Sequence, residues 1–318
     1  MLCLTKEERE KGTAVALGYF DGIHIGHRAV LEKALDVAEE KDLVPVVMLF
    51  DIHPRKLVSG VVPPMLPRTI EGCGKYYTEL LEALRGQVPA ARFAFGSFCL
   101  QEGGLALLQE LLKKASNLGY YVLLDCPEIL SATAAEQYAA ALFVKESPFA
   151  FDGLIISAFL GSDTVKPFLN RSKESGKDVF VLLRSANKSA SELQDLLTGG
   201  RLVHTAAADV ISRLGESIVT RCGYSTLGAV ASATAPDSLR NLREKYKHLF
   251  LIVDGFNAPG ANAKNCGFAF DRLGHGALVC NEGIVSAWQA EENADYLAAA
   301  KDATERMRHN LARYVTVF

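Results

Sequence analysis

The chain has 318 residues, 49% of them hydrophobic, and a net charge of −3, which suits one large α/β barrel or two average domains. Its 34 basic and 37 acidic residues form no long run of one sign, so we expect no nucleic-acid partner. The seven cysteines are scattered without a CxxC pair, which argues against a disulfide framework or a zinc site. The N-terminus becomes charged at Lys6, before a signal-peptide apolar region can form, and no apolar run approaches the ~18 residues of a membrane span. We therefore expect a cytoplasmic protein with no membrane partner.

Short apolar or β-branched runs alternate with helical patterns along almost the whole chain, which indicates a parallel sheet. The expected strands are Ala14–Tyr19, Val44–Phe50, Arg92–Phe95, Tyr120–Leu124, Leu154–Ser157, Val179–Leu183, Leu227–Ala231, Phe250–Val253 and Ala277–Cys280. The last eight would complete a (β/α)8 TIM barrel, and the first would belong to an N-terminal strand–helix addition. The expected division is residues 1–42 for the addition and residues 43–318 for the barrel.

Several prolines between Val58 and Gly74 predict a long loop after the first barrel strand. In this fold such a loop lies on the face that carries the active site. A flexible insertion is an equally good interpretation of the segment.

The sequence His24-Ile25-Gly26-His27 follows the first expected strand and begins a helix that reaches about Glu40. Imidazole donors at a helix N-terminus favour a phosphate group, and Gly26 lets that group approach the backbone. The candidate phosphate- and nucleotide-binding residues are Asp21, His24, Gly26 and His27.

This segment, continued through Arg55, resembles the start of the FAD synthetase (FMN adenylyltransferase) module. The resemblance implies that His24 and His27 bind the triphosphate of ATP, with Mg²⁺, during adenylyl transfer. That module also has a Ser/Thr cluster closely followed by arginine, whereas here the segment Ser131–Thr133 is followed by no arginine before Arg171. The motif therefore indicates either a nucleotidyltransferase or a folding element whose histidines lie on the surface.

From about Val44 onward the chain resembles orotidine 5'-phosphate decarboxylase of the bacterial long-chain type. The matching stretches, in the family's order, are Phe159–Phe168, Val179–Asn187, Ala233–Leu239, Leu251–Ala261 and Gly276–Ala287. The resemblance implies a barrel without a cofactor, a pyrimidine nucleotide as substrate, and a homodimer formed across the barrel mouths.

The family's decarboxylation depends on an alternating lysine–aspartate array, because the carbanion left at C6 needs a positive charge and a proton donor. The family's strand-three motif Asp-x-Lys-Arg-Gly-Asp appears here as Asp125–Leu130. Asp125 remains, but Pro127 stands at the lysine position and Leu130 at the second aspartate position. Arg92 stands at the strand-two lysine position, and arginine is a poor acid because it stays protonated. The array is therefore expected to be degenerate.

The family's ligand-binding positions are altered as well. Glu282 replaces the arginine that clamps the 5'-phosphate, and Pro259 replaces a phosphate-side glutamine. Ala186 replaces the central hydroxyl residue of the Thr-Ser-Asn stretch that contacts the pyrimidine. The remaining candidates for ligand binding at the barrel mouth are Asp163, Arg184, Ser185, Asn187 and Gly260.

Several of these residues have a structural alternative. Asp125 could accept backbone N–H bonds at the strand end, Asp163 could cap a helix, and Arg184 could form an ion pair inside the mouth. The histidines outside the N-terminal motif show no metal-ligand spacing, and we expect no metal site.

The favoured hypothesis is a catalytically degenerate barrel that binds a nucleotide-like small molecule or a partner. The alternative is an FMN adenylyltransferase-like nucleotidyltransferase that uses ATP and Mg²⁺. The least favoured is an active decarboxylase in which Lys56 or Lys75 from the long loop has entered the site.

Overall fold

The computed structural model describes residues 13–18, 36, 40, 44–49, 62–129, 131–157, 159, 161–290 and 295–315. The chain divides into two compact units, Met1–Gly60 and Val61–Phe318.

In the first unit, strands β1 (Thr13–Gly18) and β2 (Val44–Leu49) form a parallel pair, in a register from Thr13 opposite Val44 to Gly18 opposite Leu49. We expected the strand from Val44 to begin the barrel, and the structure corrects this: β2 pairs with β1 in a separate two-stranded sheet. An apolar run identifies a buried parallel strand but does not specify its neighbour, so the sequence could not decide between the two sheets.

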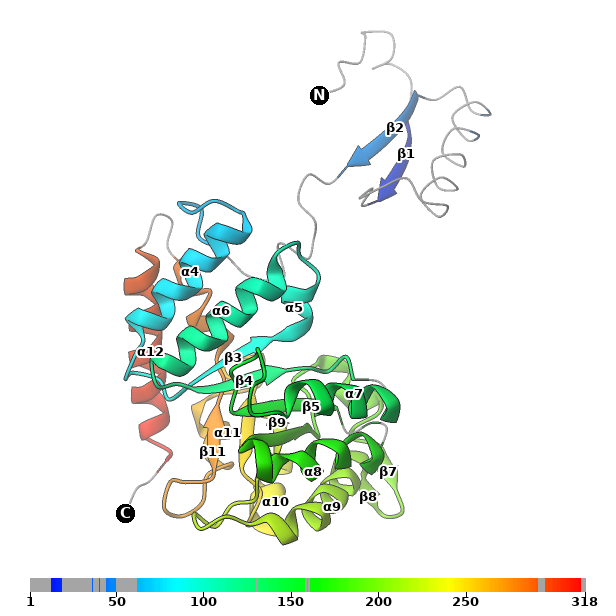
Figure 1. Ribbon diagram of the computed structural model, residues 1–318, viewed down its shortest axis with the longest axis vertical. Coiled ribbons are helices and arrows are strands. Elements are labelled where there is room, and N and C mark those ends of the chain that lie inside the picture. Colours follow the sequence, from blue (N-terminus) through cyan, green and yellow to red (C-terminus); the bar gives the residue numbers. More distant parts are fainter. Residues whose placement is uncertain are drawn as a thin grey trace. The chain divides into compact units, whose positions relative to one another are not determined.

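In the second unit, seven parallel strands form one curled sheet in the order β11-β10-β9-β6-β5-β4-β3 (Figure 1). Its strands are β3 (Ala90–Ala94), β4 (Tyr121–Asp125), β5 (Gly153–Ser157), β6 (Asp178–Leu182), β9 (Leu227–Ser232), β10 (Leu251–Asp254) and β11 (Ala277–Val279). They match the last seven expected strands to within about two residues at each end. The predicted α/β class and barrel architecture are confirmed in this curled sheet.

Helices follow the strands and cover the outside of the sheet (Figure 1). They are α4 (Ile70–Ala83), α5 (Phe95–Cys99), α6 (Gly104–Asn117), α7 (Ala132–Leu142), α8 (Lys166–Ser175), α9 (Val203–Gly215), α10 (Pro236–Lys245), α11 (Ala263–Gly267) and α12 (Tyr296–Ala312). A short antiparallel hairpin, β7 (Leu197–Thr198) and β8 (Arg201–Leu202), precedes α9. In the part of the chain that the structure describes, no helix is both long and apolar enough to cross a membrane.

Several helices begin at a residue whose side chain caps the first turn. Thr69 accepts a hydrogen bond from the N–H of Gly72 at 3.2 Å and caps α4. The helix therefore begins at Ile70, four residues before Gly74, where the long loop was expected to end. Ser131 caps α7 and Asp295 caps α12 in the same way.

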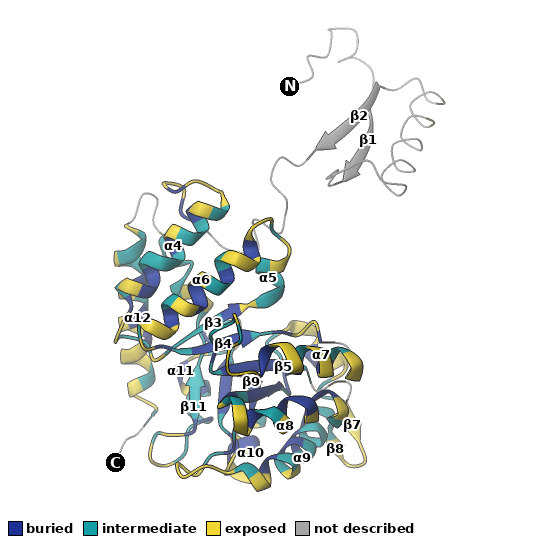
Figure 2. Cartoon of the chain, viewed as in Figure 1, coloured by how far each residue is buried: buried dark blue, intermediate teal, exposed yellow. Residues whose placement is uncertain are grey.

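Alternate residues of each strand face opposite sides of the sheet, and both sides are packed. The outer side packs on the helices through residues such as Leu124, Val181 and Val253. The inner side forms a separate cluster, whose buried members are Leu123, Ile155, Phe180, Val230 and Ile252. Figure 2 shows buried central strands, with the exposed surface concentrated on the outer faces of the helices. The next inward-facing residue of a strand, two positions after a member of this cluster, therefore lies towards the carboxyl end of the sheet.

Candidate functional site

An arginine held between two carboxylates lies at the carboxyl end of the sheet. Arg92 on β3 donates to Asp125 on β4, with Nη2–Oδ2 and Nε–Oδ2 distances of 2.5 and 3.1 Å. Its Nη1 donates to Oδ1 of Asp254 on β10 at 2.7 Å. The three side chains are largely shielded from water, with 26%, 16% and 19% of their surfaces exposed. All of the arginine's charged end is thus directed at protein carboxylates.

The pKa values in this cluster reflect competition between burial and charge. Burial alone would lower the pKa of Arg92, but the carboxylates of Asp254 and Asp125 raise it above its ordinary value. Burial raises the pKa of Asp254, against the opposing effect of Arg92. The neighbouring thiol of Cys280 has a pKa raised to about 12, first by burial and then by Asp254. Cys280 is therefore a neutral thiol and a poor nucleophile near neutral pH.

A pocket of about 940 Å³ opens around this cluster. Besides Arg92, Asp125, Asp254 and Cys280, its wall includes residues from the loops after β4, β6, β10 and β11 and from one face of α12. These are Pro127, Ser185, Ala186, Asn187, Gly255, Phe256, Asn257, Ala258, Asn281, Glu282, Gly283, Ser286, Ala303, Arg306, Met307 and Asn310. The volume is ample for a nucleotide-sized ligand.

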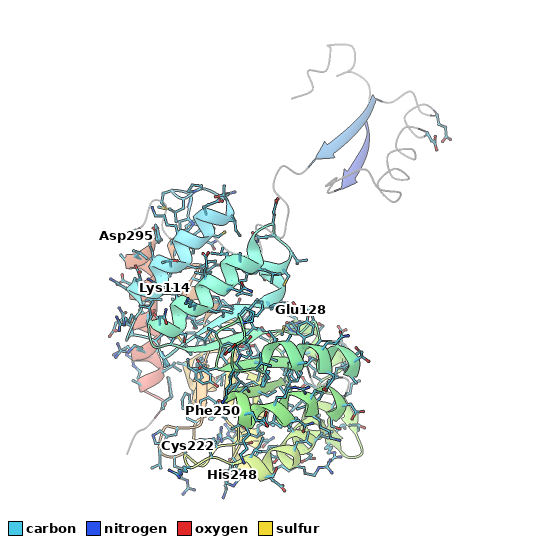
Figure 3. All side chains as sticks on the ribbon, in the orientation of Figure 1. Lys114, Glu128, Cys222, His248, Phe250 and Asp295 are labelled. Carbon is cyan, nitrogen blue, oxygen red and sulfur yellow. The ribbon has the colours of Figure 1, made fainter. Side chains whose placement is uncertain are left out.

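The pocket lies at the strand ends where enzymes of this fold carry out their chemistry. Glu128 follows β4 and so marks the carboxyl end of the sheet, whereas Cys222 and His248 precede β9 and β10 and mark its amino end. Figure 3 shows Glu128 at the opposite end of the sheet from the other two. Pro127, beside Glu128, lines the pocket at the position where the family resemblance places a proton-donating lysine. Among the described residues, no lysine lines this pocket.

The structure brings some of the predicted ligand-binding residues to the pocket. Ser185 and Asn187 line it, and Gln194 orients Ser185 by accepting a hydrogen bond from its backbone N–H at 2.8 Å. Asp163 is exposed and lies outside the pocket wall, and it caps no helix. Gly260 also lies outside the wall, in a turn with a φ of 86° that favours glycine.

Arg184 has an ion-pairing role instead of lining the pocket. Its Nε and Nη2 donate to the two carboxylate oxygens of Asp195 at 3.1 and 3.0 Å, and its Nη1 donates to the carbonyl of Ser185 and to Thr234. The Arg184 guanidinium lowers the pKa of Asp195. The sequence left anion binding and ion pairing open for Arg184. Four of the five N–H donors of its guanidinium are already used in these contacts, which favours ion pairing.

Several predicted site residues lie outside the described residues. They are Asp21, His24, Gly26 and His27 of the N-terminal motif, together with Leu130 and Lys56. Lys75, the other lysine considered as a relocated donor, is on α4 next to Glu79 and does not line the pocket. No group of three or more His, Cys, Asp or Glu side chains is placed to hold a metal ion within the described part of the chain.

Sequence reasoning missed most residues of the pocket wall, among them Asp254, Cys280, Arg306 and Asn310. Asp254 and Cys280 face inward at strand ends, a position that the alternation of each strand could have indicated. Arg306 and Asn310 belong to a helix rich in charged residues, where nothing in the pattern separates a pocket residue from a solvated one.

Comparison with known proteins identifies two regions. Residues 102–267 match the family described as Orotidine 5'-phosphate decarboxylase / HUMPS family, and residues 6–70 match FAD synthetase. The chain is 30% identical over 249 residues to the orotidine 5'-phosphate decarboxylase of Rhodopirellula baltica, an alignment that covers 74% of this chain and 82% of the relative.

Solved structures agree with the family match. The OMP decarboxylase of Leishmania donovani is 26% identical, with a TM-score of 0.62, and the match covers 79% of this chain and 92% of that one. The orotidine 5'-monophosphate decarboxylase of Plasmodium berghei has a TM-score of 0.65 at 12% identity, covering 78% of this chain and 75% of that one, and supports the fold alone. Both resemblances read from the sequence are therefore confirmed.

Proposed function

Because this chain belongs to the orotidine 5'-phosphate decarboxylase / HUMPS family, we propose that it binds a pyrimidine nucleotide-like ligand in the barrel pocket without decarboxylating it. The reaction named for its relatives replaces a carboxylate on carbon with a proton. It therefore requires a group that can deliver that proton within hydrogen-bond reach.

The observation that carries the proposal is the state of the pocket's cations. No described lysine lines the pocket, and Arg92, at the lysine position, donates to Asp125 and Asp254 through Nε, Nη1 and Nη2. A guanidinium whose pKa is raised still further holds its protons and cannot act as the acid. Its charge is also neutralised locally by two carboxylates, which leaves little to stabilise a carbanion.

The residue at the second lysine position supports the same conclusion. Pro127 faces the pocket and has neither a side-chain proton nor a backbone N–H to donate. The least favoured hypothesis is an active decarboxylase in which Lys56 or Lys75 has entered the site. Lys75 gives it no support, because this residue lies on α4 outside the pocket wall.

Ligand binding remains chemically reasonable. The pocket combines a large volume with hydrogen-bonding side chains of Ser185 and Asn187, which the resemblance assigns to pyrimidine contacts. Isothermal titration calorimetry of the purified chain with orotidine 5'-phosphate tests this part directly. We expect measurable, saturable binding that falls when Asn187 is replaced by alanine, and the absence of binding would remove the proposal.

The second candidate is adenylyl transfer by the N-terminal segment, which the match of residues 6–70 to FAD synthetase supports. Ser131, the nearest candidate for that module's later Ser/Thr motif, instead caps α7. The test is pyrophosphate release from ATP and Mg²⁺ in the presence of FMN, with His24→Ala/His27→Ala as the comparison. Equal release by both proteins would exclude this candidate.

We also propose a homodimer formed at the barrel mouth, by analogy with the family. Exposed apolar side chains after β6 support it: Leu193, Leu196 and Leu197 are 44%, 50% and 76% exposed. Large apolar side chains grouped in one surface segment are typical of an interface.

A further inference from the structure

Helix α12 contributes a wall of the pocket that the family's ligand motifs do not include. Ala303, Arg306, Met307 and Asn310 line the pocket and are three, four and seven residues apart, so they lie on one face of the helix. Met307 is buried, whereas Arg306 and Asn310 are exposed. This face thus presents a cation and an amide at an accessible side of the cavity.

Arg306 differs from Arg92 in having donors that no described residue engages. Among the described pocket residues these two are the cations, and Arg92 is already paired with Asp125 and Asp254. Arg306 makes no hydrogen bond or ion pair with any residue that the structure describes. By contrast, Arg308 on the same helix pairs with Glu305 at 3.2 Å and lies outside the pocket.

One negative charge of the pocket lies on a different element, the loop after β11. Glu282 is exposed on the loop after β11, and its charge contributes to the raised pKa of Asp254. A phosphate near Glu282 would be repelled, at the position where the resemblance places the family's phosphate-clamping arginine. The same repulsion directs an anionic group away from that loop.

We infer that Arg306, assisted by the side-chain amide of Asn310, binds the phosphate monoester of the pocket's ligand. This inference rests on the proposed function and relocates the anion contact from the loop after β11 to helix α12. The arginine fork supplies two parallel N–H donors to phosphate oxygens, and the amide of Asn310 supplies a third donor one helical turn away. The ligand class is therefore a nucleoside 5'-monophosphate, in preference to the free nucleoside.

The experiment compares uridine 5'-monophosphate with uridine by isothermal titration calorimetry, using the full chain. We expect the wild-type chain to bind the nucleotide more tightly than the nucleoside. Arg306→Ala should weaken nucleotide binding by about 10-fold to 100-fold, the usual effect of losing a charged hydrogen bond, and leave uridine binding unchanged. Arg308→Ala, the matched control on the same helix, should bind both ligands as the wild type does.

Equal affinity of the wild-type chain for nucleotide and nucleoside would overturn the inference while leaving the proposed function intact. So would equal nucleotide binding by Arg306→Ala and Arg308→Ala. If the wild-type chain bound neither ligand, the proposed function itself would fail, and the inference with it. Circular dichroism of each variant separates loss of the contact from loss of the fold.

Discussion

Arg92 on β3 and Asp254 on β10 lie 2.7 Å apart, although four strands separate β3 from β10 in the sheet order. Only a strongly curled sheet can bring these two strands together, so the ion pair spans the mouth of the barrel. The same contact engages Arg92, which the family resemblance places at a lysine position of the array. One interaction therefore connects the curvature of the fold with the proposed loss of decarboxylation.

The first prediction concerns the stability that this ion pair contributes. Arg92→Met leaves Asp125 and Asp254 largely buried without a countercharge, and we expect it to lower the free energy of unfolding by about 3–5 kcal/mol. Arg240→Met removes an exposed pair with Asp237 and should cost less than about 1 kcal/mol. Urea denaturation at pH 7 measures both, and equal stability of the two variants would contradict the structure.

The pH dependence of that variant has a definite sign. Without Arg92, the raised pKa of Asp254 rises further, so the native state binds a proton more readily than the unfolded state does. A raised carboxyl pKa gives stability that is present below the unfolded pKa of about 3.9 and is lost as pH increases. The deficit of Arg92→Met relative to the wild type should therefore shrink as pH falls from 7 towards 4. A constant deficit would show that Asp254 is not the affected group.

A second prediction concerns Lys177, which is buried away from the pocket. Its Nζ donates to the carbonyl of Leu142 at 2.7 Å and lies 3.8 Å from the centre of the Phe151 ring. Burial lowers the pKa of Lys177 to about 8, against the opposing effect of Asp152.

Between pH 8 and about 10.4, the unfolded chain keeps the Lys177 proton while the native chain loses it. The free energy of unfolding of the wild type should therefore rise with pH across this window, relative to Lys177→Met. Denaturation curves of both proteins at pH 7.5 and pH 10 measure the difference. An unchanged difference at the two pH values would contradict the assigned burial.

A third prediction concerns the interior of the barrel. A Cβ added at Gly228 would lie 2.6 Å from two atoms of the Phe180 ring and 2.7 Å from the carbonyl oxygen of Phe250. Gly228→Ala should cost about 1–3 kcal/mol through overpacking. Phe180→Leu should recover part of that loss in the double variant, because it removes the ring atoms. If the Gly228→Ala variant were as thermally stable as the wild type, the inner cluster would have room for the added methyl group, and the close packing around Gly228 would be wrong.

A fourth prediction concerns the proposed dimer. Leu197→Asp places a charge on the most exposed of the three leucines after β6, and it should shift the chain from dimer to monomer in analytical ultracentrifugation. Leu273→Asp, at a position 58% exposed in another loop, should leave the assembly unchanged. A monomeric wild-type chain would exclude the dimer.

The sequence allowed a good prediction of the strands, because each is a short apolar run flanked by polar or glycine-containing segments. It could not place the strand from Val44, since such a run fits either neighbour equally well. The contact between Arg92 and Asp254 was also beyond reach, because the two residues are 162 positions apart and no short motif contains both. Arg184 shows the same limit: its partner, Asp195, is fixed by the packing of the loop after β6.

The most direct test of the central claim is the release of CO₂ from carboxyl-labelled orotidine 5'-phosphate by the purified chain. The orotidine 5'-phosphate decarboxylase of Rhodopirellula baltica is the positive control. Because no described lysine lines the pocket and Arg92 is tied to Asp125 and Asp254, we expect no release above the rate without protein. Catalytic release that is lost in a variant of a pocket residue would contradict the account.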